Sequence, residues 1–141
     1  MISELRSYIN ESVLLCDADY KEIRDPFGSD DLSLARIDTH YKFIVGDDSA
    51  FVDGNYHGDT FACSLEIYKK SGVDEITDFD NLYDLALDVK AEIINPLRVK
   101  NNDCFTDIEI TSLTPESLPS NDKVFRIIIN LQVRRDFDYR S

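Results

Sequence analysis

The strongest pattern in this sequence is the alternation over residues 124–133, which read V-F-R-I-I-I-N-L-Q-V. Every second position from Phe125 to Val133 is apolar, and the other side of the alternation includes arginine, asparagine and glutamine. A period of two over this length predicts a β-strand with one buried face. A long strand needs neighbours, because an exposed edge invites aggregation. We therefore expect a sheet that contains this segment.

Two other patterns predict the rest of the fold. Apolar residues at helical spacing predict an amphipathic helix over 3–15 and a second helix that begins at an Asp78 or Asp80 cap and ends at Ile94, before Pro96. Alternation predicts further strands over 35–46, 60–70 and 104–112.

The order of these elements predicts an α+β fold. With 141 residues, the chain suits a single domain over 1–141. We expect a sheet of about four strands, mainly antiparallel, with both helices on one face.

Two segments show no regular pattern. The stretch Gly46–Asp59 combines three glycines with four acids and predicts a long loop, and residues 134–141 predict a flexible charged tail. Residues 114–122 predict a turn-rich connection.

Charge excludes several classes of partner. Asp and Glu number 28 against 15 Lys and Arg, which gives a formal net charge of −13. Free-standing nucleic-acid binding and an anionic membrane surface both require clustered basic residues. No apolar run reaches the ~20 residues of a membrane helix, and no basic-then-apolar start indicates a signal peptide. We expect no membrane partner.

The candidate catalytic and metal residues are few. Cys16, Cys63 and Cys104 are widely spaced, which argues against disulfides or a zinc site and favours a reducing cytoplasm. Cys63 falls on an apolar stripe and reads as a core residue. One possible function is an enzyme or cation site at His57 with its acidic neighbours Asp53 and Asp59. The spacing of these residues matches no known loop motif. We expect no catalytic residue, metal or cofactor.

Exposed aromatic and basic residues point instead to an interaction surface. Aromatic and arginine side chains are enriched at protein interfaces. The candidates lie in the expected loop and tail and are Phe51, Val52, Tyr56, Arg134, Arg135, Phe137 and Tyr139.

The layout of the whole chain resembles the tail terminator, or tail-to-head joining, proteins of bacteriophages. The features that carry the resemblance are an N-terminal helix, a strand entered through Ala35-Arg36-Ile37-Asp38, the loop Gly46–Asp59, the strand Phe61–Lys70, the helix Asp80–Ile94 with Leu82-Tyr83-Asp84-Leu85, and a last strand ending in Leu131-Gln132-Val133-Arg134-Arg135.

The resemblance implies a non-enzymatic virion protein. Such proteins form rings, usually of six copies, that cap the tail tube and then bind the head connector. The implied partners are other copies of this chain, the tube protein and the connector protein, in the tail or neck of a virion assembled in the host cytoplasm. DNA would pass through the ring without specific binding, because an acidic wall repels phosphates.

A different class of function fits the same charge and size. A small acidic cytoplasmic binding or regulatory domain, such as an inhibitor that mimics nucleic acid, would also be acidic and without catalytic residues.

Overall fold

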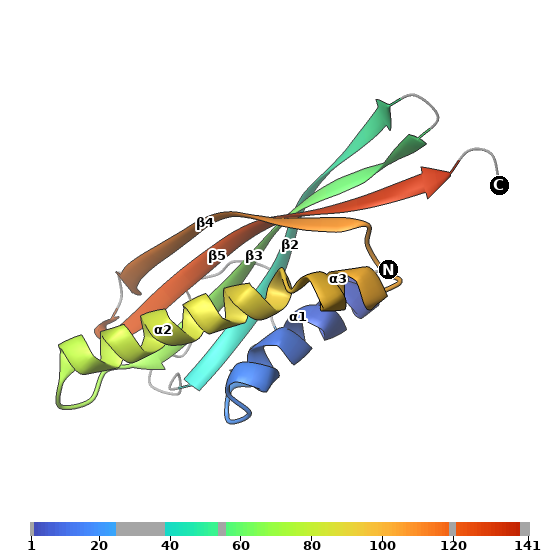
Figure 1. Ribbon diagram of the computed structural model, residues 1–141. Coiled ribbons are helices and arrows are strands. Elements are labelled where there is room, and N and C mark those ends of the chain that lie inside the picture. The colour runs from blue at the N-terminus through green and yellow to red at the C-terminus, as the bar shows by residue number, and fades with distance from the viewer. Residues whose placement is uncertain (1, 25–38, 54–55, 119–120, 139–141) are drawn as a thin grey trace.

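The computed structural model describes residues 2–24, 39–53, 56–118 and 121–138. Helix α1 (Ile2–Cys16) precedes a short strand β1 (Lys21–Glu22) and the hairpin of β2 (Thr39–Asp53) with β3 (Tyr56–Lys70). Helices α2 (Glu75–Ile93) and α3 (Pro96–Asn101) follow, and then strands β4 (Asp107–Leu118) and β5 (Asn121–Asp138). The helices lie together on one face of the sheet (Figure 1).

The sheet has the order β1-β2-β3-β5-β4. All pairs are antiparallel except β1 with β2, in which Lys21 is opposite His40 and Glu22 is opposite Tyr41. The mainly antiparallel α+β fold is confirmed, and the expected strand over 124–133 lies inside the sheet as part of β5.

The expected numbers of elements were too low. Within the described residues the sheet has five strands, not four, and there are three helices, not two. The extra strand β1 is only two residues long, too short to show a period. The extra helix α3 begins at Pro96, which was read as a helix terminator but occupies the first turn, where proline is favoured. Asn95 caps α3 by accepting a hydrogen bond from the Leu97 amide at 3.1 Å.

The cap of α2 also differs from the expectation. Asp74, rather than Asp78 or Asp80, is the N-cap, and its carboxylate accepts from the Thr77 amide at 3.1 Å. Asp78 instead accepts from the Gly72 amide at 2.6 Å. Both carboxylates lie near the positive end of the helix dipole, so each stabilises this end.

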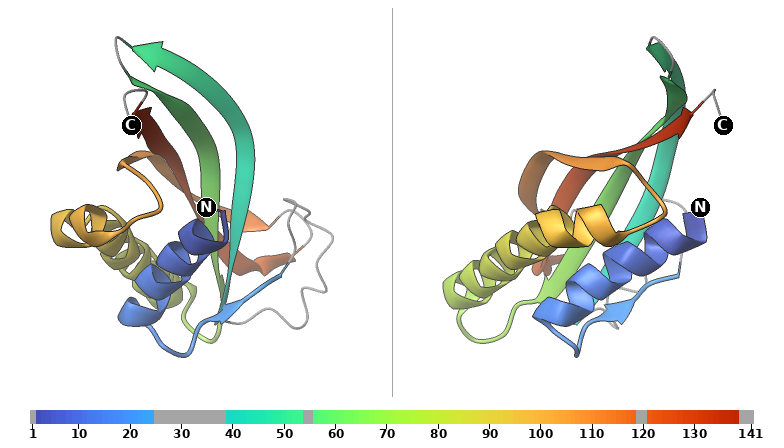
Figure 2. Two further views of the ribbon diagram at one scale, coloured as in Figure 1. Left: turned by 90° about the vertical axis from the view of Figure 1, so that its right-hand side faces the viewer. Right: turned by 45° about the vertical axis from the view of Figure 1, so that its right-hand side comes forward.

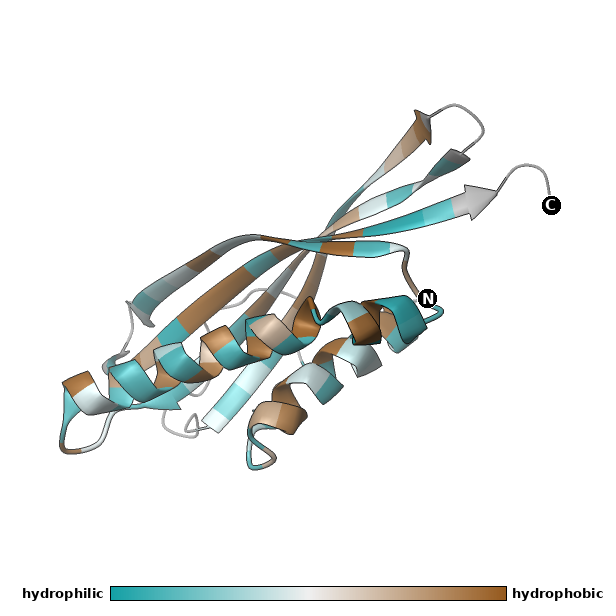
Figure 3. Ribbon diagram, viewed as in Figure 1, coloured by the Kyte–Doolittle hydropathy of each residue, from teal (hydrophilic) through white to brown (hydrophobic). Residues whose placement is uncertain are grey.

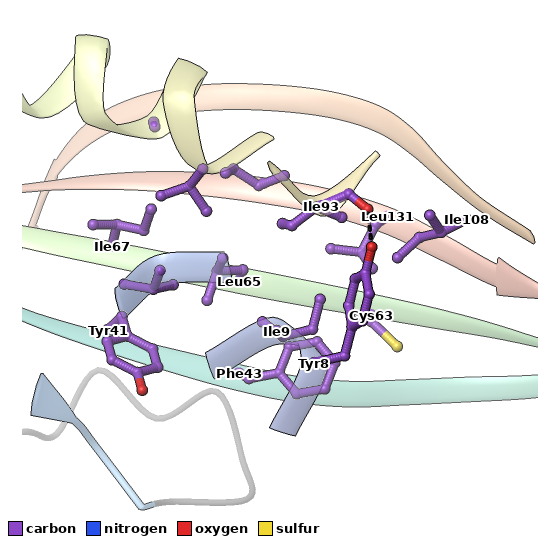
Figure 4. Close-up of a cluster of buried hydrophobic side chains, with 14 of the residues drawn as sticks. Tyr8, Ile9, Tyr41, Phe43, Cys63, Leu65, Ile67, Ile93, Ile108 and Leu131 are labelled. Carbon is purple, nitrogen blue, oxygen red and sulfur yellow. Dashed lines mark hydrogen bonds between the residues drawn. The ribbon is translucent and has the colours of Figure 1, made fainter. Parts of the chain in front are cut away.

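The core lies between the helices and the sheet. Fully buried residues from the helices, such as Leu5, Ile9 and Val89, meet the alternating residues of the central strands, among them Leu65 and Ile129. Figure 4 shows this cluster. The predicted apolar face of the last strand is therefore buried as expected, and Cys63 belongs to the core, 4% exposed.

Tyr8 links the helices to each other inside this core. Its hydroxyl donates to the Ile93 carbonyl at 2.8 Å (Figure 4), and its ring meets Phe105 edge-on with centroids 4.9 Å apart. Burial raises the pKa of Tyr8, so the hydroxyl stays a donor. The contact fixes the N-terminal half of α1 against the end of α2.

Arg98 ties α3 to both longer helices. Its guanidinium lies 4.3 Å from the centroid of the Tyr8 ring and donates to Ser12 Oγ at 2.7 Å, to the Glu92 carbonyl at 2.8 Å and to the Tyr8 carbonyl at 3.2 Å. The planar guanidinium spreads its five donors in a fixed fork and stacks on an aromatic ring, whereas the compact ammonium of lysine does neither. The three helices are thus held as one layer.

The face of the sheet away from the helices buries a charged cluster. The Tyr68 hydroxyl donates to Glu66 Oε1 at 2.5 Å, and Arg126 Nη1 lies 3.9 Å from the same oxygen. Arg126 also binds Glu116 on β4, and fully buried Lys42 is directly opposite Glu66. Two positive and two negative groups therefore balance across four strands, as buried charges require.

Two β-bulges flank one row of the sheet. The row runs Val45–Cys63–Leu131–Ile110 across β2, β3, β5 and β4. β2 has one extra residue between Val45 and Asp48, and β4 has one between Ile110 and Ser112. Bulges bend a strand and increase its twist. Beyond this row the sheet leaves the helical layer, as both views in Figure 2 show.

Candidate functional site: the projecting end of the sheet

The expected loop Gly46–Asp59 is largely strand. β2 continues to Asp53 and β3 begins at Tyr56, so the segment forms the far end of a hairpin. The prediction of a loop was wrong because the glycines and aspartates here occupy strand positions: Gly46 and Asp47 lie at a bulge, and Gly58 is buried between its neighbouring strands. Gly46 lies at the bulge, where a Cβ would come within 2.8 Å of the Ala62 carbonyl oxygen.

The expected charged tail is also strand as far as Asp138. Residues 134–138 extend β5 and pair with β3: Arg134 is opposite Thr60, and Phe137 is opposite His57. We call residues 48–53, 56–61 and 133–138 together the projecting end. It extends past the helices in Figure 1. Figure 3 shows that the far part of β5 is hydrophilic, unlike its central part.

The projecting end brings together the two segments that were predicted separately as interaction surface. Arg134 on β5 places its guanidinium 4.3 Å from the centroid of the Phe51 ring on β2, across the intervening strand β3. Arg134 Nε also donates to Asp136 Oδ1 at 2.6 Å. A guanidinium over an aromatic face is stabilised by the ring quadrupole.

Gly58 is the residue that lies between them. By register it is opposite Phe51 on one side and Asp136 on the other. A Cβ at this position would lie 1.9 Å from the Arg135 carbonyl oxygen, so only glycine fits. Without a side chain at 58, Phe51 and Arg134 meet over the backbone of β3.

Thr106, the residue before β4, completes the cluster. Its amide donates to the Arg134 carbonyl at 2.7 Å, and its hydroxyl accepts from the Asp136 amide at 2.9 Å. Gly58, Thr106 and Asp136 were not predicted as site residues. Arg134 and Asp136 are two positions apart, which on a strand places them on one face, and this spacing was the available signal.

The other predicted residues have separate positions. Val52 is 77% exposed near the tip of β2, and Arg135 is half-buried on the face opposite Arg134. Tyr56 and Phe137 are placed by their strands, opposite Asp138 and His57. Tyr139 lies outside the described residues.

The histidine and cysteine considered for chemistry lie in the sheet. In the described part of the chain no group of three or more His, Cys, Asp and Glu residues is arranged to hold a metal ion. His57 is opposite Val52 and Phe137 in the sheet. Burial raises the pKa of Cys63 to about 11, which disfavours the nucleophilic thiolate.

A concavity of about 460 Å³, lined by both polar and apolar residues, adjoins the row Val45–Cys63–Leu131–Ile110. Its lining includes Ser64, Ser112 and Asn130. The Ser64 hydroxyl donates to Asn130 Oδ1 at 2.8 Å, and Asn130 Nδ2 donates to Ser112 Oγ at 3.0 Å. These groups satisfy one another across β3, β5 and β4.

No helix among the described residues is long and apolar enough to cross a membrane.

Comparison with known proteins gives a likeness of fold. No protein-family model and no curated protein sequence matches this chain. Among solved structures, the fold resembles a chain described as part of the virion of a native gene transfer agent particle, with a TM-score of 0.63. The match covers 94% of this chain and 95% of the other, at 10% sequence identity. The two chains thus share one fold over nearly their whole lengths.

Proposed function

We propose that this chain is a non-enzymatic structural protein of a virion, which closes a tail tube as a ring and joins the tail to the head connector. The observation that carries the virion role is the shared fold with a chain of a gene transfer agent particle over 94% of this chain. The tail-capping role adds the resemblance of the sequence layout to tail terminator proteins.

The geometry of the projecting end supports an assembly role. Three strands leave the helical layer together and carry exposed residues such as Val52. Their side chains are ordered by the Arg134–Phe51 contact and by Thr106. A rigid projection with an exposed aliphatic residue suits contact with a partner protein, because such surfaces bind with little loss of conformational entropy.

Charge supports the path of DNA through such a ring. Each subunit has a formal net charge of −13. A ring of these subunits, six by the resemblance, would repel phosphates and let DNA slide without being held. The partners would be other copies of the chain, the tube protein and the connector protein, and the location would be the tail or neck of the virion.

Deletion of the gene tests this function. In a strain that produces particles from the genome encoding this chain, we expect the deletion to yield tails of irregular length and heads that are not joined to tails, by negative-stain electron microscopy. Supply of the wild-type chain from a plasmid should restore joined particles. Joined particles of normal length without this chain would contradict the proposal.

A further inference from the structure

One edge of the sheet is covered near the helices and open in the projecting end. β1 pairs with β2 at His40 and Tyr41, and the Ile23 amide donates to the Tyr41 carbonyl at 2.7 Å. Arg6 Nη1 then donates to the Phe43 carbonyl at 3.0 Å. The outward carbonyls of β2 are therefore satisfied up to Phe43.

Beyond Phe43 the edge of β2 is uncovered in the part of the chain that the structure describes. No described strand pairs with the outer edge between Ile44 and Asp53. Because outward-facing residues alternate and the bulge inserts one residue, the outward backbone groups here belong to Val45 before the bulge and to Asp48, Ala50 and Val52 after it. A row of this length is a template for another strand.

The opposite edge of the projecting end belongs to β5. β4 begins at Asp107, opposite Arg134, so within the described residues no strand pairs with the outer edge of β5 after Arg134. Thr106 covers the Asp136 amide, which leaves the carbonyl of Asp136 and the backbone of Asp138 toward the end of the strand. Within the described residues, the β2–β3–β5 ribbon thus has an edge on each side with which no strand pairs.

Charge decides between two ways of joining copies. The edge of β2 from Ile44 to Asp53 carries three aspartates and no basic residue. Two such edges placed together would set like charges opposite each other, which destabilises strand pairing. Residues 134–138 carry two arginines and two aspartates, so they have no net charge. Joining β2 to β5 of the next copy avoids the repulsion.

We propose that the β2 edge from Ile44 to Asp53 accepts the end of β5 of a second copy, so that the ribbon continues from one copy to the next. The strands β2 and β5 both run antiparallel to β3, so the new pair would be parallel around a ring. Head-to-tail contacts close into a ring when the rotation between successive copies closes, and otherwise form an open filament. The inference rests on the proposed ring and identifies the contact that builds it.

Substitution of Ala50 tests the edge. Ala50→Pro removes an outward amide and leaves the pairing with β3 in place, whereas Ala50→Thr keeps the amide and is the matched control. We expect Ala50→Pro to raise the concentration for half-assembly at least tenfold by mass photometry, and Ala50→Thr to resemble wild type. Near-ultraviolet circular dichroism of the monomer should be unchanged in both variants.

Cross-linking gives an independent readout. In a background with Cys16→Ser and Cys104→Ser, an equimolar mixture of Ala50→Cys chains and Arg135→Cys chains, treated with a short bismaleimide, should give cross-linked dimers. The two cysteines are placed in separate chains because Ala50 and Arg135 are both opposite Asp59 within one copy and could be linked internally. Each variant alone should give no dimers. Dimers from Ala50→Cys alone would indicate that two β2 edges meet and would overturn the head-to-tail contact.

The outcomes separate the two proposals. Wild-type rings that persist in Ala50→Pro, without dimers from the mixture of Ala50→Cys and Arg135→Cys chains, would overturn the edge contact and leave the ring function standing. A wild-type chain that stays monomeric at all concentrations and on isolated tail tubes would overturn the edge contact and the ring together. Normal particles after gene deletion would overturn the ring function itself.

Discussion

Arg134 on β5 stacks its guanidinium on the ring of Phe51 on β2, 4.3 Å from the centroid, and so links two strands that are not neighbours. The contact is partly exposed, so its contribution is modest. We expect a double-mutant cycle of Phe51→Ala and Arg134→Ala to give a coupling of about 0.5–1 kcal/mol in urea denaturation. The matched cycle of Phe51→Ala with Arg135→Ala should give a coupling near zero, because Arg135 lies on the other face. Equal couplings would contradict the contact.

Gly58 should tolerate no side chain. Gly58→Ala would place a Cβ 1.9 Å from the Arg135 carbonyl oxygen, and the strands β3 and β5 would have to separate. We expect a loss of about 2–3 kcal/mol in the free energy of unfolding. Gly72→Ala is the control, because its Cβ would meet only the flexible Asp78 carboxylate at 3.3 Å. A Gly58→Ala variant as stable as Gly72→Ala would refute the close approach.

Arg98 should be irreplaceable by lysine. Arg98→Lys keeps the charge but loses the stack on Tyr8 and most of the hydrogen bonds to Ser12, Glu92 and Tyr8. We expect the variant to lose about 2 kcal/mol of stability in thermal or urea unfolding. Arg24→Lys, at a side chain that is 85% exposed, should change stability by less than about 0.5 kcal/mol. Similar losses in the two variants would remove the role assigned to Arg98.

Alkaline pH should weaken the fold through Cys63. Burial raises the pKa of this thiol from 9.0 to about 11, so the folded state favours the protonated form. The resulting stability is fully present below pH 9 and is lost as pH rises through about 11, with a total on the order of 2 kcal/mol.

The measurement is the free energy of unfolding in urea between pH 7.5 and 11. Cys63→Ala should show a shallower decline than wild type over this range, whatever its stability at neutral pH. Ser64→Ala, at the neighbouring position without a titrating group, should follow the wild-type slope. Parallel profiles for wild type and Cys63→Ala would show that the thiol does not control the decline.

The sequence predicts the buried parts of this fold well because burial imposes a period. The strand over 124–133 and the two long helices each have one apolar face, and Ile127, Ile129 and Leu131 are buried as predicted. The alternation overestimates burial at position 125, since Phe125 is only partly buried at the edge of the core.

Most of the projecting end could not be predicted in the same way, because no core imposes a period beyond Phe61 and Val133, the last of its residues to pack in or against the core. Past these two residues both faces lie beyond the helices, so glycines, aspartates and arginines occupy strand positions without alternation. The bulge at Gly46 also shifts the alternation by one residue within β2. Pro115, read as part of a turn, lies within β4, where an edge strand tolerates the missing amide.

Short elements escaped prediction for a different reason. The two residues of β1 are held by pairing with His40 and Tyr41, which are distant in sequence. The six residues of α3 depend on Arg98 and the Asn95 cap rather than on an apolar stripe. Their stability comes from contacts that no local pattern records.

The two bulges beside the Cys63–Leu131 row have a geometric consequence. Each bulge is a single added residue, one in β2 and one in β4. The direction in which the ribbon leaves the helices therefore depends on the number of residues in these strands rather than on a loop. Because bulges bend a strand, we expect removal of Asp47 from β2 to change the direction of the projecting end. Evolution of this protein could thus adjust the tilt between its two parts by insertion or deletion alone.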